Sequence, residues 1–173
     1  MATILEGIET LDAVFSEMAE GAQESTIHRI SIAPQVYEDQ GVAITLTGAE
    51  EITEVPVFFP APPAEGHRFI VFEFDVCNDN NGDFPVSSLT NFIAVMGGRE
   101  YTVSMSALVA LERDITQLDF VVPPGRSMRG LIGFELPAVA GVVEIVYANG
   151  SVYTSSDNTE AVPIAPHTFS YER

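Results

Sequence analysis

The sequence has 173 residues, of which 46% are hydrophobic, so it is long enough to form one domain with a substantial core. It carries 25 acidic residues against seven basic ones, all of them arginine, and its formal net charge is −18. This charge opposes contact with nucleic-acid phosphates and with anionic membrane surfaces, so we expect neither as a partner.

The single cysteine and the hydropathy pattern exclude several further features. Cys77 has no second cysteine to pair with, which rules out an intrachain disulfide and a cysteine-based zinc site. No apolar run reaches the roughly 18 residues of a transmembrane helix, so we expect no membrane span. The first residues lack a basic region followed by an apolar core, so we expect no signal peptide in this sequence.

Residues 1–26 are predicted to form an N-terminal element. Between residues 3 and 20 the apolar side chains recur every three or four positions, which predicts an amphipathic helix. These residues are Ile4, Ile8, Leu11, Phe15 and Met18. Thr3 and Glu6 have the spacing of a helix capping box. Two interpretations stay open: the helix packs on its own domain, or it serves as a docking helix or stalk.

From Ile27 to the end of the chain, apolar and polar residues alternate in short runs. Repeated alternation of this kind predicts antiparallel sheets with one buried and one wet face, hence an all-β sandwich of seven or eight strands over residues 27–173. The side chains predicted to point inward are Ile30, Ile32, Val42, Ile44, Leu46, Ile70, Phe72, Phe74, Val76, Tyr101, Val103, Met105, Leu118, Phe120, Val122, Ile132, Phe134 and Leu136.

Three connections between the strands stand out. Gly97 and Gly98 separate two apolar runs and predict a tight hairpin. Residues 106–114 break the alternation, and we expect a short helical crossover there. The proline-rich residues 58–66 are interpreted as a stiff connection, with a protein-recognition loop as the alternative.

Several motifs from His67 to Tyr147 resemble a known family. They are Asn78 at the end of a strand, the Gly97-Gly98 turn, Pro124-Gly125, Gly130 and Phe134. This pattern is similar to an uncharacterised immunoglobulin-like domain family of bacterial, mainly Gram-positive, secreted proteins and lipoproteins, whose fold resembles a mycobacterial secreted immunogenic antigen. The resemblance implies an immunoglobulin-like sandwich in the extracellular space or cell envelope, and it implies no activity. The chain departs from the family in having no lipid-anchor cysteine near its start and no lysine.

Residues 75–83 are the candidate metal site. An EF-hand is excluded, because aligning Gly82 with the loop glycine places Cys77 and Ser88 where carboxylates are required. A looser, weak calcium site would use Asp75, Asp79, Asn81 and Asp83. The simpler interpretation is an Asn/Asp turn that caps its own backbone.

No catalytic constellation is apparent in the sequence. Residues 125–130 contain Ser127 between two glycines, but the second glycine is one position too late for a nucleophile elbow. His28, His67 and His167 are widely separated and show no metal-binding spacing. Cys77 has acidic neighbours that disfavour its thiolate.

These observations predict a non-catalytic, extracytoplasmic interaction or adhesion-type module without a cofactor, which binds an unknown protein or cell-envelope partner. The alternative is a domain that binds calcium or a small ligand weakly through residues 75–83. A weaker third hypothesis is an esterase-like enzyme with Ser127 as nucleophile.

Overall fold

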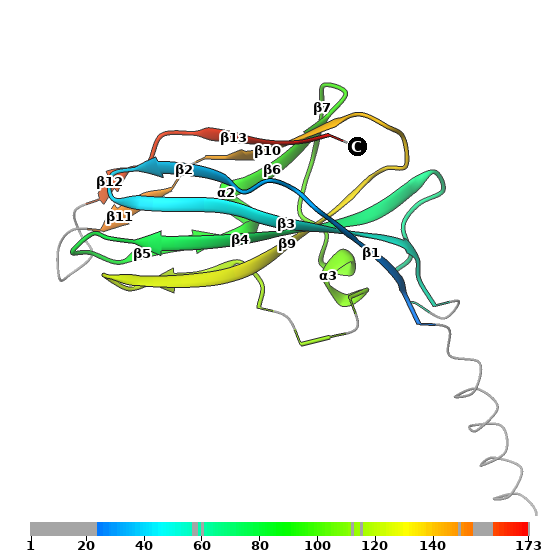
Figure 1. Ribbon diagram of the computed structural model, residues 1–173, viewed down its shortest axis with the longest axis horizontal. Helices are drawn as coiled ribbons and strands as arrows, with labels where there is room; N and C mark the ends of the chain where they lie inside the picture. The colour runs from blue at the N-terminus through cyan, green and yellow to red at the C-terminus, as the bar shows by residue number, and fades with distance from the viewer. Residues whose placement is uncertain are drawn as a thin grey trace, which may run out of the picture.

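The computed structural model describes residues 24–172, apart from residues 57, 58, 60, 112, 115, 149 and 154–160. The predicted N-terminal helix and part of the proline-rich connection therefore lie outside the described residues. The described part of the chain consists mainly of antiparallel strands in two layers, which confirms the expected all-β class (Figure 1).

The larger sheet, called sheet 1 here, contains the longest strands. Its members are β1 (Thr26–Ile30), β2 (Gln35–Asp39), β3 (Val42–Glu54), β4 (His67–Asn78) and β9 (Arg126–Pro137). The strand order is β1-β3-β4-β9, and β2 pairs with the first half of β3 while β1 pairs with the second half. A β-bulge between Leu46 and Gly48 interrupts the β3–β4 ladder.

The opposite sheet, called sheet 2, has the order β13-β10-β6-β7. Its strands are β6 (Phe92–Met96), β7 (Arg99–Tyr101), β10 (Val142–Tyr147) and β13 (His167–Glu172). The predicted hairpin is confirmed, because Gly97 and Gly98 connect β6 to β7 with φ of 59° and 76°. Such left-handed backbone conformations favour glycine.

Short elements complete the described chain. They are the ribbons β5 (Phe84–Ser87) with β8 (Asp119–Val122) and β11 (Ser151–Tyr153) with β12 (Ala161–Pro163), and the helices α2 (Ser88–Asn91) and α3 (Met105–Val109). The described residues thus form more strand segments than the seven or eight predicted: nine in the two main sheets and four, of three or four residues each, in the ribbons. Neither helix is long and apolar enough to cross a membrane.

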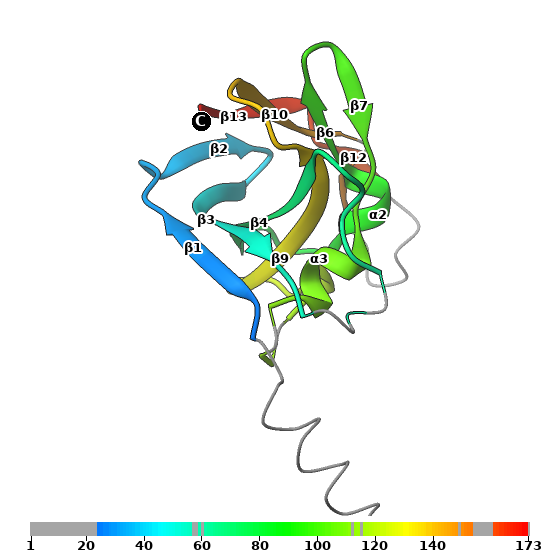
Figure 2. The same ribbon diagram turned by 90° about the vertical axis from the view of Figure 1, so that its right-hand side faces the viewer.

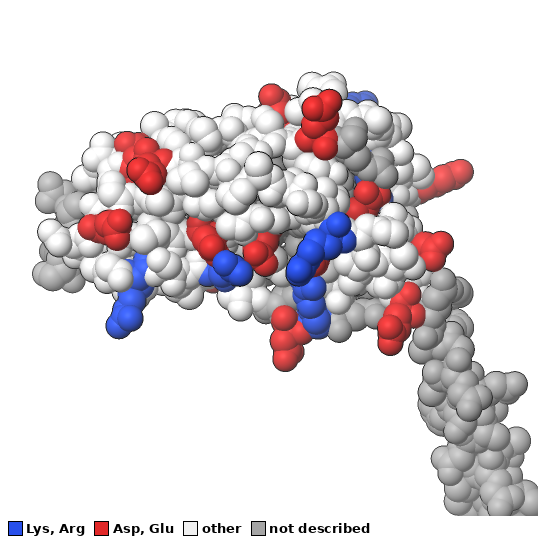
Figure 3. All heavy atoms as spheres, viewed as in Figure 1, with Lys and Arg blue, Asp and Glu red and all other residues white. Residues whose placement is uncertain are grey.

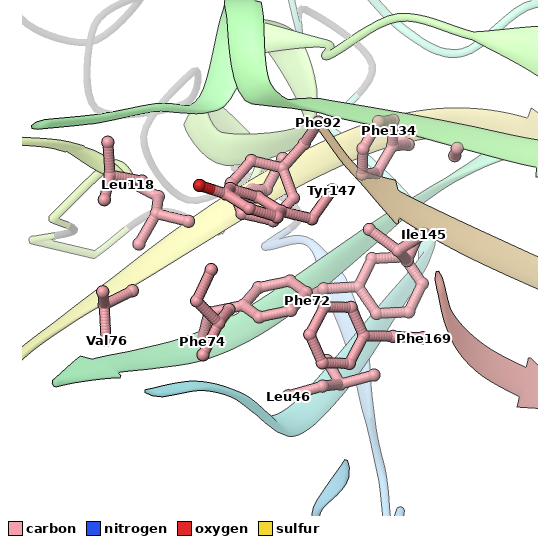
Figure 4. Packing of buried hydrophobic residues seen from close by; sticks show 14 of the residues in the cluster. Leu46, Phe72, Phe74, Val76, Phe92, Leu118, Phe134, Ile145, Tyr147 and Phe169 are labelled. Atoms are coloured by element: carbon pink, nitrogen blue, oxygen red, sulfur yellow. The ribbon is translucent and has the colours of Figure 1, made fainter. Parts of the chain in front are cut away.

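The main core lies between the two sheets, and aromatic side chains dominate it (Figure 4). Phe74 packs edge-on against Phe169 of sheet 2, with ring centroids 5.3 Å apart. The inward-facing residues predicted from alternation in β3, β4 and β9 are all buried. Met105 is a correction: it begins α3 and is 48% exposed, because the strand period ends before it.

A second, smaller core lies on the outer face of sheet 1. Ala107 and Leu108 of α3, together with Leu111, cover Phe69, Val71 and Leu131. Figure 2 shows α3 beside β9, on the side of sheet 1 away from sheet 2. The helical crossover expected within residues 106–114 is therefore present, and it covers only part of this face.

Side-chain hydrogen bonds from β2 join the two sheets at one edge. The Gln35 side chain exchanges two hydrogen bonds with the backbone of Ser170 in β13, at 2.5 and 2.8 Å. The Tyr37 hydroxyl donates to the carbonyl of Ala165 at 2.7 Å, and the Ala165 N–H donates to Asp39 at 2.8 Å. These contacts pair backbone groups at the sheet edge that would otherwise need water.

One end of the main core contains a buried ion pair. Arg68 donates to the carboxylate of Glu51 at 3.0 Å and to the carbonyl of Val139 at 3.0 Å. Both side chains are almost fully buried. Removing either partner alone would leave an uncompensated charge in the protein interior.

Candidate ligand-binding groove

The polar stretch after β4 is organised by the buried side chain of Asn78. Its amide donates to the carbonyls of Gly82 and Val122, at 2.8 and 2.9 Å, and its oxygen accepts from the N–H of Asn80 at 3.0 Å. The Asn78 carbonyl in turn accepts from the N–H of Gly125 at 2.7 Å. Residues 78–83 thus form an Asx-type turn that also holds the loop before β9.

The four candidate calcium ligands are not gathered around one point. Asp75 lies on the outer face of β4, where it accepts hydrogen bonds from Arg129 at 2.5 and 2.9 Å. Asp79 and Asn81 are exposed, and Asp83 is half-buried. Within the described residues, no three Asp, Glu, His or Cys side chains lie close enough together to hold a metal ion.

The other residues singled out in the sequence lie apart from one another. Ser127 is exposed and opposite Cys77 in the β4–β9 ladder, and the described residues that line the hollow around it include no histidine. Cys77 is half-buried, with its thiol 3.6 Å from the Asp79 carboxylate. His28, His67 and His167 belong to β1, β4 and β13.

The groove that is best defined lies on the outer face of sheet 1, beside the part covered by α3. It has a volume of about 560 Å³, which is within the usual range for small-ligand sites. Its floor includes Gly48, Ala49, Val71 and Leu131. Gly48 follows the β-bulge, and a Cβ there would approach only Glu73, at 3.8 Å, so the missing side chain leaves room above the sheet.

Arginines form much of the wall of this groove. Arg29, Arg113 and Arg129 all line it, which places three of the seven basic side chains of a strongly acidic protein at one site. In Figure 3, basic side chains lie in a row over β4, β9 and α3, with acidic side chains between them. We call this feature the arginine groove.

At one end of the arginine groove, two guanidinium groups share one carboxylate. Arg29 contacts Oε1 of Glu50 at 3.3 Å, and Arg113 contacts Oε2 of Glu50 at 2.6 Å. The Glu50 side chain is 11% exposed, whereas those of Arg29 and Arg113 are 80% and 43% exposed. The three described side chains of this cluster together carry an excess of one positive charge, and the guanidinium groups remain accessible to a ligand.

At the other end, one guanidinium serves two carboxylates. Arg129 is bidentate to Asp75 and lies 3.5 Å from Glu73. Its hydrogen bonds to Asp75, followed by the charges of Asp75 and Glu73, raise the pKa of Arg129 further above its ordinary value. Thr47, at the bulge, donates to the Glu73 carboxylate at 3.0 Å. This end therefore carries an excess of one negative charge.

No motif in the sequence identifies this groove, because Arg29, Arg113 and Arg129 stand in separate parts of the chain. Arg29 belongs to β1, and Arg113 follows α3, so only the folded chain brings both to Glu50. The sequence does show that basic residues are scarce, and this scarcity makes each arginine a candidate for a specific contact.

Comparison with known proteins shows relatives in fold. No family model matches the chain, and no curated protein is significantly similar to it. A presumed lipoprotein of Bacillus subtilis superposes with a TM-score of 0.57 at 11% identity, over 82% of this chain and 39% of that one. The chain thus spans well under half the length of that protein.

Two further structures share the fold. A protein of unknown function from Listeria monocytogenes gives a TM-score of 0.50 at 12% identity, over 73% of this chain and 77% of that one. A conserved hypothetical protein from Bacillus anthracis gives 0.50 at 15% identity, over 83% and 99%. The chain therefore has a β-sandwich fold that also occurs in uncharacterised proteins of Gram-positive bacteria, one of them a presumed lipoprotein.

Proposed function

We propose that the protein is a non-catalytic interaction module of the bacterial cell envelope, with an immunoglobulin-like type of sandwich, and that it binds a protein or envelope partner through the arginine groove. The observation that carries this proposal is the partly covered outer face of sheet 1. Residues 105–111 cover one part of that face, and the part beside them is a groove with accessible charged side chains.

Two observations support this proposal over an enzymatic role. Each carboxylate that we describe in the groove is bonded to an arginine or a threonine, an arrangement suited to holding charges in place rather than to moving protons. Among the residues that the structure describes, those lining the groove include no histidine and no cysteine. The envelope location is supported by the presumed lipoprotein among the proteins with the same fold.

Site-specific photo-cross-linking tests this proposal. A photoreactive residue at Ser31, which is exposed at the rim of the groove, should cross-link a discrete partner in a Gram-positive envelope extract. The same residue at Thr168, exposed on β13 of sheet 2, is the matched control and should give no such product.

The charge variant Arg113→Glu in the Ser31 background should abolish the cross-link, whereas Arg99→Glu on β7 should leave it intact. Equal cross-linking from Ser31 and Thr168, or a product insensitive to Arg113→Glu, would show that the arginine groove is not the interaction surface.

A further inference from the structure

The two ends of the arginine groove have opposite excess charge. The Arg29–Glu50–Arg113 cluster has two positive groups and one negative group, and the Glu73–Asp75–Arg129 cluster has one positive group and two negative groups. A ligand that matches both ends must itself carry an anionic group and a cationic group at a fixed separation.

Strand geometry gives that separation. Val71 pairs with Glu50 in the β3–β4 ladder, and Glu73 and Asp75 follow two and four residues later in β4, with Asp75 opposite Arg129 of β9. At about 3.3 Å per residue, the separation along the sheet is about 7 Å to Glu73 and about 13 Å to Asp75. An extended peptide covers the longer distance with about four residues.

We propose that the arginine groove binds the carboxyl terminus of an extended peptide, with the terminal carboxylate at Arg29 and Arg113. A basic side chain at about the fourth residue from the end then faces Glu73 and Asp75. This proposal rests on the proposed function and names the chemistry of the partner. Arginine suits the role because its fork of N–H donors can bind a second carboxylate while it keeps its contact with Glu50.

The floor of the groove limits the size of the peptide residues that lie between the terminal carboxylate and the basic side chain of the ligand. Gly48 carries no side chain, and Ala49, Val71 and Leu131 are each at most 9% exposed, so little side-chain surface rises from the floor. Residues with small side chains fit between the two clusters. The net charge of −18 further favours a ligand that carries a basic group over a purely anionic one.

Fluorescence anisotropy with synthetic peptides tests this inference on the full chain. The probe is an N-terminally labelled peptide Gly-Lys-Ala-Ala-Val with a free carboxylate, at low salt. Its C-terminal amide should bind about tenfold more weakly, equivalent to the loss of one charged contact. Replacing the lysine of the peptide by glutamate should weaken binding by a similar factor.

Protein variants assign the effect to the groove. Arg29→Gln and Arg113→Gln should each weaken binding of the acid peptide and leave binding of the amide unchanged, whereas Arg99→Gln on β7 should change neither. Arg29 has an 80% exposed side chain, so its variant tests the inference even if Arg113→Gln disturbs folding through Glu50. The melting temperature of each variant checks folding.

Equal affinity for the acid and the amide, or no binding of either at about 1 mM peptide, overturns the inference. Equal weakening by Arg99→Gln also overturns it, because binding would then follow net charge alone. If one of these results is found but the cross-link from Ser31 is still observed, the proposed function stands. In that case only the peptide carboxyl terminus is excluded as the ligand.

Discussion

Asn78 shows how one side chain can organise several loops. It is fully buried and bonds to residues 80, 82 and 122 through its side chain, and its carbonyl binds Gly125. These bonds satisfy backbone groups in two separate segments, residues 80–82 and 122–125. The residue therefore accounts for the polar character of the turn without a metal ion.

Replacing Asn78 by alanine should lower the free energy of unfolding by about 2–4 kcal/mol, because two buried carbonyls lose their donor and a cavity forms. Urea denaturation measures the change. Asn81→Ala, at an exposed position of the same turn, is the matched control and should stay within about 0.5 kcal/mol. Equal effects of the two substitutions would contradict the structural role of Asn78.

The calcium hypothesis leads to a separate measurement. The Asp75 carboxylate binds Arg129, and the Asp79 carboxylate accepts from the Cys77 thiol at 3.6 Å. We therefore expect about 10 mM calcium chloride to leave the melting temperature unchanged, since extracellular calcium modules bind at roughly 10⁻⁴–10⁻³ M. A rise that disappears in the Asp79→Asn, Asp83→Asn double variant would instead establish the calcium site.

His167 should make stability depend on pH. Its ring stacks on that of Tyr37 with centroids 4.3 Å apart, and burial lowers its pKa below the ordinary value of 6.5. The unfolded chain therefore binds the proton more readily than the folded chain. The contribution of the neutral ring is complete above about pH 6.5 and decreases as the pH falls below that value.

His167→Phe keeps an aromatic ring against Tyr37 but cannot titrate. The stability of the wild type relative to this variant, measured by urea denaturation, should decrease between pH 7.5 and pH 5. If the free energy of unfolding of the wild type relative to the variant stays constant, or increases as the pH falls, the histidine is not held in its neutral form.

At the scale of elements, the close approach of α3 to β9 depends on Gly133. A Cβ at this position would lie 2.7 Å from the Cβ of Ala107 and 3.0 Å from the carbonyl oxygen of Ser104. The Ser104 N–H donates to the carbonyl of Gly133 at 2.7 Å, so the two segments cannot separate without losing this bond. The contact holds the start of α3 against β9.

Gly133→Ala should destabilise the protein by about 1–3 kcal/mol, because the added methyl group overpacks this contact. Gly48→Ala is the matched control in β3. Its added Cβ meets only Glu73, at 3.8 Å, so thermal or urea unfolding should show a change within about 0.5 kcal/mol. A neutral Gly133→Ala substitution would show that α3 does not pack closely on β9.

At the scale of the whole molecule, net charge governs the response to salt. With 25 acidic and seven basic residues, repulsion among like charges opposes the compact state. Raising sodium chloride from about 10 mM to 500 mM shortens the screening length from about 30 Å to roughly 4 Å and should raise the melting temperature. A fall would mean that the surface ion pairs outweigh this repulsion; sorbitol at equal osmolality controls for exclusion of the solute.

The predicted strands show what can be read from alternation. Four apolar side chains of β4 all point into the core: Ile70, Phe72, Phe74 and Val76. Side chains along a strand alternate between the two faces of the sheet, and the apolar ones lie on the buried face. Met105 departs from this expectation because a helix begins there. The short strands β5, β11 and β12 were missed because three or four residues carry too little periodicity to identify them.

Local sequence patterns predict the all-β class, the inward face of the long strands β3, β4 and β9, the glycine hairpin and the capping Asn/Asp turn, because these features depend on neighbouring residues. The packing of distant segments instead sets which part of sheet 1 is covered and which charges meet across it. Arg29, Glu50 and Arg113 come from three separate segments, and the β-sheet register and the packing of α3 against Gly133 place those segments side by side. Such long-range pairings leave no periodic signal in the chain, since nothing in the residues next to each of these charges indicates its distant partner.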